Sequence, residues 1–166
     1  MKKSILTITV VLSLLNGLNG LEAQTTRIKP NQVELVKKLI GNWKAEWTDT
    51  IYKWEAVSYG TGMECHYSFK SIAKDTIVLE GKQLWGYNSK LDKYVGIDLM
   101  KGMDIKILAM WFTSHNKYIG TDYRNISNPD NSSWKVEGEI ESSDAFSETW
   151  IINGKPFMTI DLKRIK

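Results

Sequence analysis

Apolar and polar residues alternate along most of the chain that follows Gly41, as they do in strands that bury one face of a sheet. The clearest example is residues 134–141, where apolar or small residues alternate with lysine and glutamate. Residues 43–48 and 63–70 show the same period of two. Residues 105–112 are more continuously apolar, which predicts a strand that is covered on both faces. The pattern therefore predicts a chain built mainly of β-strands.

Short polar turns separate the predicted strands. Residues 84–99 predict one strand, a polar connection that contains Asn88 and Asp92, and a second strand, because such side chains bond to the nearby backbone and interrupt a ladder. The pair Asn153-Gly154 is a strong hairpin signal before the last apolar run, residues 157–165.

Together these segments predict an all-β fold: a single up-and-down antiparallel β-barrel of about nine or ten strands with a short N-terminal helix. An antiparallel sheet of that length rarely stays open, since closure removes its unpaired edges. A two-sheet sandwich of the immunoglobulin type is the competing architecture, but an opening helix and an unbroken meander fit it poorly.

The predicted helix precedes the first strand. Asn31 and Glu34 have the spacing of a capping box, in which the two side chains bond backbone amides of the first turn. Apolar residues then recur at helical spacing up to Ile40, and Gly41 suits the position just after a helix end. The helix is therefore expected over about residues 32–40, where it covers one end of the barrel.

The junction of this helix with the first strand resembles a known superfamily. A short helix followed by Gly-x-Trp at residues 41–43 is similar to the calycins, which include lipocalins, fatty-acid-binding proteins and their bacterial relatives. In that superfamily the tryptophan closes one barrel end, and a basic residue of the last strand lies across its ring. The resemblance assigns these structural roles to Trp43 and Arg164, in a contact that combines cation–π attraction with packing.

A second motif narrows the resemblance. The hairpin from Trp-Gly-Tyr at residues 85–87 to Lys-Tyr-Val-Gly at 93–96 is similar to a family of bacterial lipocalin-like domains of unknown function. The likeness spans most of residues 35–166, with no match over residues 47–79 and 116–131. That family has no agreed catalytic residues, so the resemblance implies a fold and leaves the activity open.

The first residues have the features of an export signal. Two lysines precede a short apolar run, residues 5–15, and the small residues near Ala23 suit a signal peptidase. We predict a signal peptide over residues 1–23, a flexible leader over 24–30 and a barrel domain over 31–166. The apolar run is too short to span a bilayer, and an uncleaved N-terminal anchor is the alternative. The expected location is the periplasm or the extracellular space.

The composition and the charge pattern limit the kinds of partner and of cross-link that are expected. The 166 residues carry a formal net charge of +3, with the two signs mixed along the chain. Nucleic-acid binding needs clustered Lys and Arg, so no nucleic-acid partner is expected. The single Cys65 cannot form an internal disulfide, and its place in the alternation predicts a buried thiol without a catalytic role. Seven tryptophans and seven tyrosines supply large apolar areas for a core.

No metal site, cofactor or catalytic residue is predicted. His66 and His115 are the only histidines, and Zn²⁺ needs three or four ligands at suitable spacing. Haem ligation by His115 is the alternative, although residues 113–116 equally suit a polar hairpin turn. The chain also contains neither a Gly-x-Ser-x-Gly motif nor a glycine-rich phosphate loop.

Residues on the predicted inner faces are the candidates for ligand binding. Glu148 shares a strand face with Phe146 and Trp150, which places a carboxylate among aromatic rings. A different register, or a local bulge that turns Glu148 to water, is the alternative. The candidate ligand-binding residues are Trp47, Tyr67, Trp85, Trp111, Glu148 and Trp150.

The predicted function is the binding of a small apolar or amphipathic molecule inside an exported lipocalin-like barrel, without catalysis. Two alternatives stay open. If the large rings fill the interior, the protein is an interaction module with a filled core and a protein partner. If Glu148 acts as a general acid or base, the protein is an enzyme for a small substrate. A cavity and a filled core require the same alternation, so the pattern does not separate them.

Overall fold

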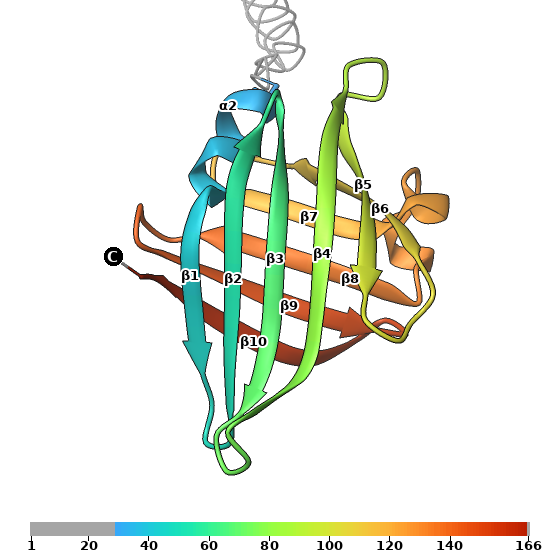
Figure 1. The fold of residues 1–166 in the computed structure, drawn as a ribbon. Coiled ribbons are helices and arrows are strands. Elements are labelled where there is room, and N and C mark those ends of the chain that lie inside the picture. The colour runs from blue at the N-terminus through green and yellow to red at the C-terminus, as the bar shows by residue number, and fades with distance from the viewer. Residues whose placement is uncertain (1–28, 166) are drawn as a thin grey trace, which may run out of the picture.

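The computed structural model describes residues 29–165. The predicted signal peptide and most of the predicted leader lie outside the described residues. The described chain forms one closed barrel of ten antiparallel strands with a short helical segment before the first strand (Figure 1). The predicted all-β, up-and-down barrel is therefore confirmed, and the sandwich alternative is wrong.

The elements follow one another with short connections. In chain order they are α2 (Gln32–Val36), the 3-10 helix η2 (Lys37–Leu39), β1 (Gly41–Glu46), β2 (Thr50–Tyr59), β3 (Gly62–Ser71), β4 (Thr76–Asn88), β5 (Lys93–Met100), β6 (Lys106–Phe112), β7 (Lys117–Asp122), the 3-10 helices η3 (Tyr123–Asn125) and η4 (Pro129–Asn131), β8 (Trp134–Ile140), β9 (Ala145–Ile152) and β10 (Lys155–Arg164).

Each strand pairs with the next in sequence, and β1 pairs with β10 to close the barrel. Because consecutive strands run in opposite directions, their connections alternate between the two ends. The β1–β2 and β3–β4 hairpins lie at the end away from α2 (Figure 1). The turn residues suit these connections: Asn153 and Gly154 both have positive φ, as a two-residue hairpin turn requires.

The helical segment is tied to one end of the barrel. Asn31 caps it by accepting a hydrogen bond from the Glu34 amide at 3.2 Å. The predicted helix over residues 32–40 ends earlier as an α-helix, since η2 tightens its last turn. The buried Gln32 exchanges two hydrogen bonds with the backbone of Phe112 at the end of β6, at 3.0 and 2.7 Å. No helix of the described residues is long and apolar enough to cross a membrane.

Trp43 and Arg164 meet where the barrel closes. They are direct partners in the β1–β10 ladder, and the Arg164 guanidinium carbon lies 4.1 Å from the centre of the Trp43 ring. The Trp43 indole N–H donates to the Leu39 carbonyl at 2.9 Å, and Arg164 Nη1 donates to the Ile40 carbonyl at 2.8 Å. These bonds join the helical segment to the first and last strands.

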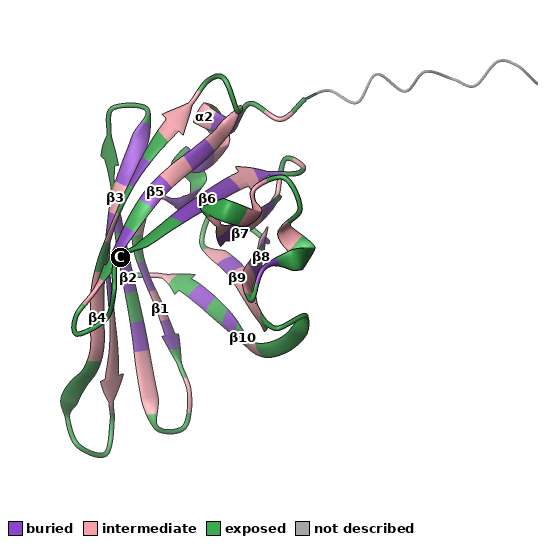
Figure 2. Cartoon of the chain, turned by 90° about the vertical axis from the view of Figure 1, so that its right-hand side faces the viewer, coloured by how far each residue is buried: buried purple, intermediate pink, exposed green. Residues whose placement is uncertain are grey.

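The prediction for residues 105–112 is only half right. Buried and exposed positions alternate along most strands (Figure 2), whereas β6 begins with two exposed residues, Lys106 and Ile107, and Ile105 just before it is exposed as well. From Leu108 onward the strand is buried except for the half-buried Trp111, and Ala109 is covered even on the outer face, where η3 packs against β6. The inner face of β6 therefore carries Leu108, Met110 and Phe112.

Candidate functional site

The barrel encloses a cavity of about 340 Å³ with largely aromatic and aliphatic walls. Side chains from nine of the ten strands contribute, together with Leu39 at the helix end. The aromatic side chains that line it are Tyr52, Trp54, Tyr67, Phe69, Trp85, Tyr118, Trp134, Trp150 and Phe157. A volume of this size and an apolar lining are typical of small-molecule sites.

The mouth of the cavity faces away from α2. Met103, in the β5–β6 loop, and Phe157, at the start of β10, both line the cavity and are 57% and 66% exposed. Ile152, at the end of β9, adds a third partly exposed apolar side chain. These residues lie in or beside the connections at the open end, whereas Trp43 and Arg164 close the other end. An apolar molecule therefore meets an apolar rim before it enters.

Glu148 lies on the cavity wall within a neutral hydrogen-bonding shell. The Tyr118 hydroxyl donates to its Oε1 at 2.7 Å, and the Trp150 indole N–H donates to its Oε2 at 3.0 Å. Burial raises the pKa of Glu148, and the two donated hydrogen bonds offset this only in part. The alternative in which a bulge turns Glu148 to water does not occur, since β9 pairs regularly with β8 and places Glu148 on the inner face.

A glycine makes the contact between Tyr118 and Glu148 possible. Tyr118, Gly138 and Glu148 are direct cross-strand neighbours on β7, β8 and β9. The Tyr118 ring lies over Gly138, and a methyl group at that position would overlap the ring. The ring therefore crosses the intervening strand and brings its hydroxyl group to the carboxyl group of Glu148.

A similar arrangement holds Asp98 on the opposite side of the barrel, although Asp98 is the direct cross-strand partner of Gln83 and not of the glycine. The Tyr67 ring on β3 lies over Gly81 on β4, and its hydroxyl donates to Asp98 Oδ1 on β5 at 2.8 Å. Asp98 is buried, and burial raises its pKa, with hydrogen bonds from Tyr67 and Gln83 acting in the other direction. The cavity thus holds two carboxyl groups, each fixed by a tyrosine.

The sequence-based candidates divide into two groups. Tyr67, Trp85, Glu148 and Trp150 line the cavity, whereas Trp47 and Trp111 do not. Trp47 follows the last residue of β1 and stacks on Phe69, with ring centres 6.4 Å apart. Trp111 lies on the outer face of β6, where Lys93 Nζ sits 3.5 Å from the centre of its ring. The continuous apolar run around Trp111 gave no sign of which face it occupies.

Several cavity residues were missed by the sequence analysis. Tyr52 and Trp54 alternate with charged residues along β2, so their period of two was an available signal. Asp98 and Tyr118 gave no comparable signal, because their importance comes from cross-strand register. The other reactive side chains lie elsewhere: Cys65 is fully buried, with a thiol pKa raised by burial, and neither histidine lines the cavity.

Comparison with known proteins adds no assignment. No family model matches the chain, and a search of curated proteins finds no match. The resemblance to calycins and bacterial lipocalin-like domains therefore stays a prediction.

The raised pKa of Glu148 predicts how stability depends on pH. The native state holds this proton more tightly than the unfolded chain, so the contribution is full below the ordinary carboxyl pKa and is lost as pH rises through the raised value. Glu148→Gln removes the ionisable group, and with it this loss of stability at higher pH, while it keeps a side chain of similar shape. We expect the variant to gain stability relative to the wild type as pH rises from 4 to 7, by on the order of 1 kcal/mol.

Urea unfolding of the two proteins at a series of pH values measures this difference. The groups that face Glu148 from other strands are Tyr52, Cys65 and Tyr118, and burial raises the pKa of each, so they stay neutral throughout this range. The pair measured at pH 4 is the control. A difference that does not change with pH would mean that Glu148 keeps an ordinary pKa in the native protein.

Proposed function

We propose that this barrel binds a small apolar or amphipathic molecule in its cavity and does not transform it. The observation that carries the proposal is the cavity of about 340 Å³, walled by aromatic rings and lined by only a few polar groups. Small-molecule sites combine these features, since apolar walls supply affinity and the polar groups fix orientation. Export of the protein, predicted from residues 1–23, is part of the same proposal.

The polar groups suit binding better than turnover. Glu148 and Asp98 each accept a hydrogen bond from a tyrosine that lies across a glycine on the intervening strand. Such fixed groups orient a bound molecule. A reactive nucleophile would be needed for covalent turnover, but the Cys65 thiol is fully buried, and its raised pKa keeps it protonated.

A cavity-filling variant tests the proposal. Gly120 faces the cavity, and a Cβ atom there would lie 3.7 Å from Val136 Cβ, an ordinary contact. Gly120→Leu therefore extends a side chain into open space. We expect the neutral fluorophore prodan to bind the wild type with one-to-one stoichiometry. The variant should bind it at least about tenfold more weakly, which corresponds to a loss of about 1.4 kcal/mol or more in binding free energy. Fluorescence titration measures both affinities.

Trp111→Ala is the matched control, because it changes an aromatic residue on the outer face of the same barrel. This variant should bind prodan as the wild type does. Circular dichroism of all three proteins shows whether they are folded. Equal binding by the wild type and Gly120→Leu, with both folded, would place the dye outside the cavity and contradict the proposal.

A second candidate function, protein interaction, is favoured by one feature of the outer surface. Leu84, Ile97 and Ile107 are direct cross-strand neighbours on β4, β5 and β6, and all three are exposed, at 40%, 38% and 53%. A row of exposed apolar side chains is typical of interaction surfaces. Absence of prodan binding, together with a dimer or a bound protein in native mass spectrometry, would favour this candidate instead.

A further inference from the structure

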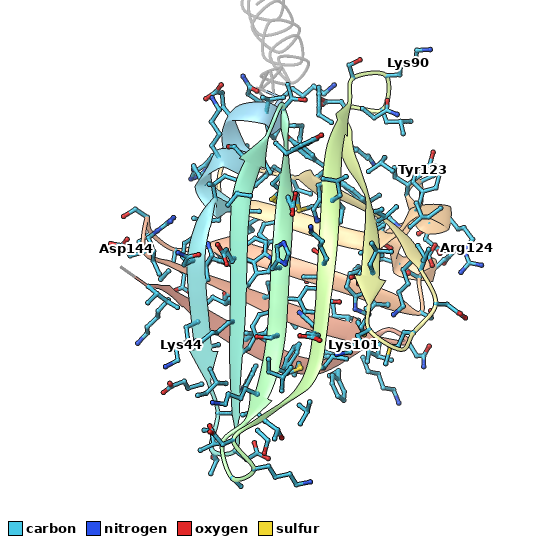
Figure 3. All side chains as sticks on the ribbon, viewed as in Figure 1. Lys44, Lys90, Lys101, Tyr123, Arg124 and Asp144 are labelled. Atoms are coloured by element: carbon cyan, nitrogen blue, oxygen red, sulfur yellow. The ribbon has the colours of Figure 1, made fainter. Side chains whose placement is uncertain are left out.

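Two carboxyl groups lie inside the barrel, whereas many basic side chains are paired outside it. Lys44, Lys101 and Arg124 project from the surface (Figure 3), where they form ion pairs with Glu46, Glu80 and Asp122. Inside, Glu148 and Asp98 both line the cavity, and the negative charge of each adds to burial in raising the pKa of Tyr52. The two carboxyl groups therefore act on one shared interior.

Of the two carboxyl groups in the cavity, Glu148 is the one without a cationic neighbour among residues 29–165. None of the ion pairs between residues 29 and 165 includes Glu148 or Asp98. Asp98, however, has Lys106 as its direct cross-strand partner on β6, and that positive charge favours its ionised form. Nothing comparable acts on Glu148, whose contacts are the neutral donors of Tyr118 and Trp150.

The hydrogen bonds around Glu148 suit its ionised form and leave room for more donors. Both neighbours donate, one to each oxygen. A carboxylate offers about four acceptor sites, so roughly two remain free in a residue that lines the cavity. An unpaired charge in a buried site is costly, and a cation that enters the cavity would remove that cost.

Aromatic rings around the same space favour a positive charge. Tyr52, Trp54 and Trp150 line the cavity with Glu148, and the faces of such rings attract cations. The attraction is strongest where water is excluded, as in a cavity of this kind. A carboxylate ligand would meet one basic side chain in the cavity, Lys106 beside Asp98, but two carboxyl groups and the negative ring faces would repel it.

We infer that the ligand of this barrel is an organic cation, a protonated amine on an apolar body, with its ammonium group beside Glu148 and its apolar part toward the mouth. This inference rests on the proposed function, because it names the ligand class of the same cavity. The ammonium N–H groups fill the free acceptor sites of Glu148, and the apolar part contacts the aromatic walls and the rim at Met103 and Phe157.

Three probes of equal chain length test the inference: octylamine, 1-octanol and octanoate. Octylamine is protonated at pH 7, since alkylamines have a pKa near that of lysine, about 10.4. Isothermal titration calorimetry with the protein that lacks the predicted signal peptide, residues 24–166, gives the three affinities. We expect octylamine to bind about tenfold to a hundredfold more tightly than octanol, as a charge-assisted hydrogen bond provides, and octanoate to bind most weakly.

Two variants test whether Glu148 is the source of the preference for octylamine over octanol. Glu148→Gln should lower octylamine affinity by about tenfold or more and leave octanol affinity unchanged. Asp161→Asn is the matched control, because Asp161 is exposed on β10, one strand away, and its loss changes the net charge equally. The control should retain the full preference for octylamine.

The outcomes separate this inference from the proposed function. Equal binding of octylamine and octanol, or an unchanged preference in Glu148→Gln, would overturn the cation inference while the cavity keeps its role in binding. Tighter binding of octanoate would have the same meaning. Failure of all three probes to bind, together with failure of prodan, would overturn the proposed function as well.

Discussion

Replacing Trp43 with alanine is expected to lower the free energy of unfolding by about 3–5 kcal/mol, the range for removing a buried tryptophan ring. The ring is almost fully buried, and Phe146 packs edge-on against it with ring centres 4.6 Å apart. Its loss leaves a cavity where β1 and β10 close the barrel and removes the surface over which Arg164 lies. It also removes the indole donor of the Leu39 carbonyl.

Urea unfolding followed by circular dichroism measures the effect, with Trp111→Ala as the comparison. Trp111 has the same ring but lies half-buried on the outer face beneath Lys93, so we expect a loss of only about 1 kcal/mol. Similar losses in the two variants would mean that Trp43 has no special part in closing the barrel.

The strand pattern was predictable because most strands have one buried and one exposed face. Residues 63–70 and 134–141 show a period of two, and they lie in β3 and β8 with Cys65, Tyr67, Val136 and Ile140 buried inside. The capped helix and the final hairpin were predictable for a similar reason, since each depends on residues close together in the chain.

The second half of the binding site was not predictable, because β5 reverses the usual pattern. Val95, Ile97 and Leu99 lie on its outer face, while Tyr94, Gly96 and Asp98 face inward. Apolarity alone would therefore place Asp98 outside. The Trp85 ring occupies the space that a side chain at residue 96 would need, so only glycine fits beside this ring.

Register explains what alternation does not. Tyr67, Gly81 and Asp98 lie on three consecutive strands, as do Tyr118, Gly138 and Glu148, and in each case the tyrosine reaches over the glycine. Consecutive members of a triplet are 10 to 20 residues apart in the chain, and only strand pairing brings them together. Glu148 could be predicted from its own strand, but the partner that fixes it could not.

Gly138→Ala should therefore destabilise the barrel and disturb the site together. The added methyl group would overlap the Tyr118 ring, so the ring must move and its hydroxyl must leave Glu148 Oε1. Overpacking of this kind costs about 1–3 kcal/mol, and the buried carboxyl group loses one of its two donors in addition. We expect a loss near the upper end of that range, about 3 kcal/mol, measured by urea unfolding.

Gly120→Ala is the matched control, because Gly120 also faces the interior, on β7 next to β8. A methyl group there makes only ordinary contacts, at 3.7 Å to Val136 and 4.0 Å to Trp134. Alanine in a strand also restricts the unfolded chain more than glycine does, so this variant should match or exceed the wild type by up to about 1 kcal/mol. If both variants lose stability equally, the glycine at residue 138 has no special role in making room for the Tyr118 ring. A loss confined to Gly138→Ala, accompanied by weaker octylamine binding, would show that the packing of the Tyr118 ring over Gly138 is what holds Glu148 in place.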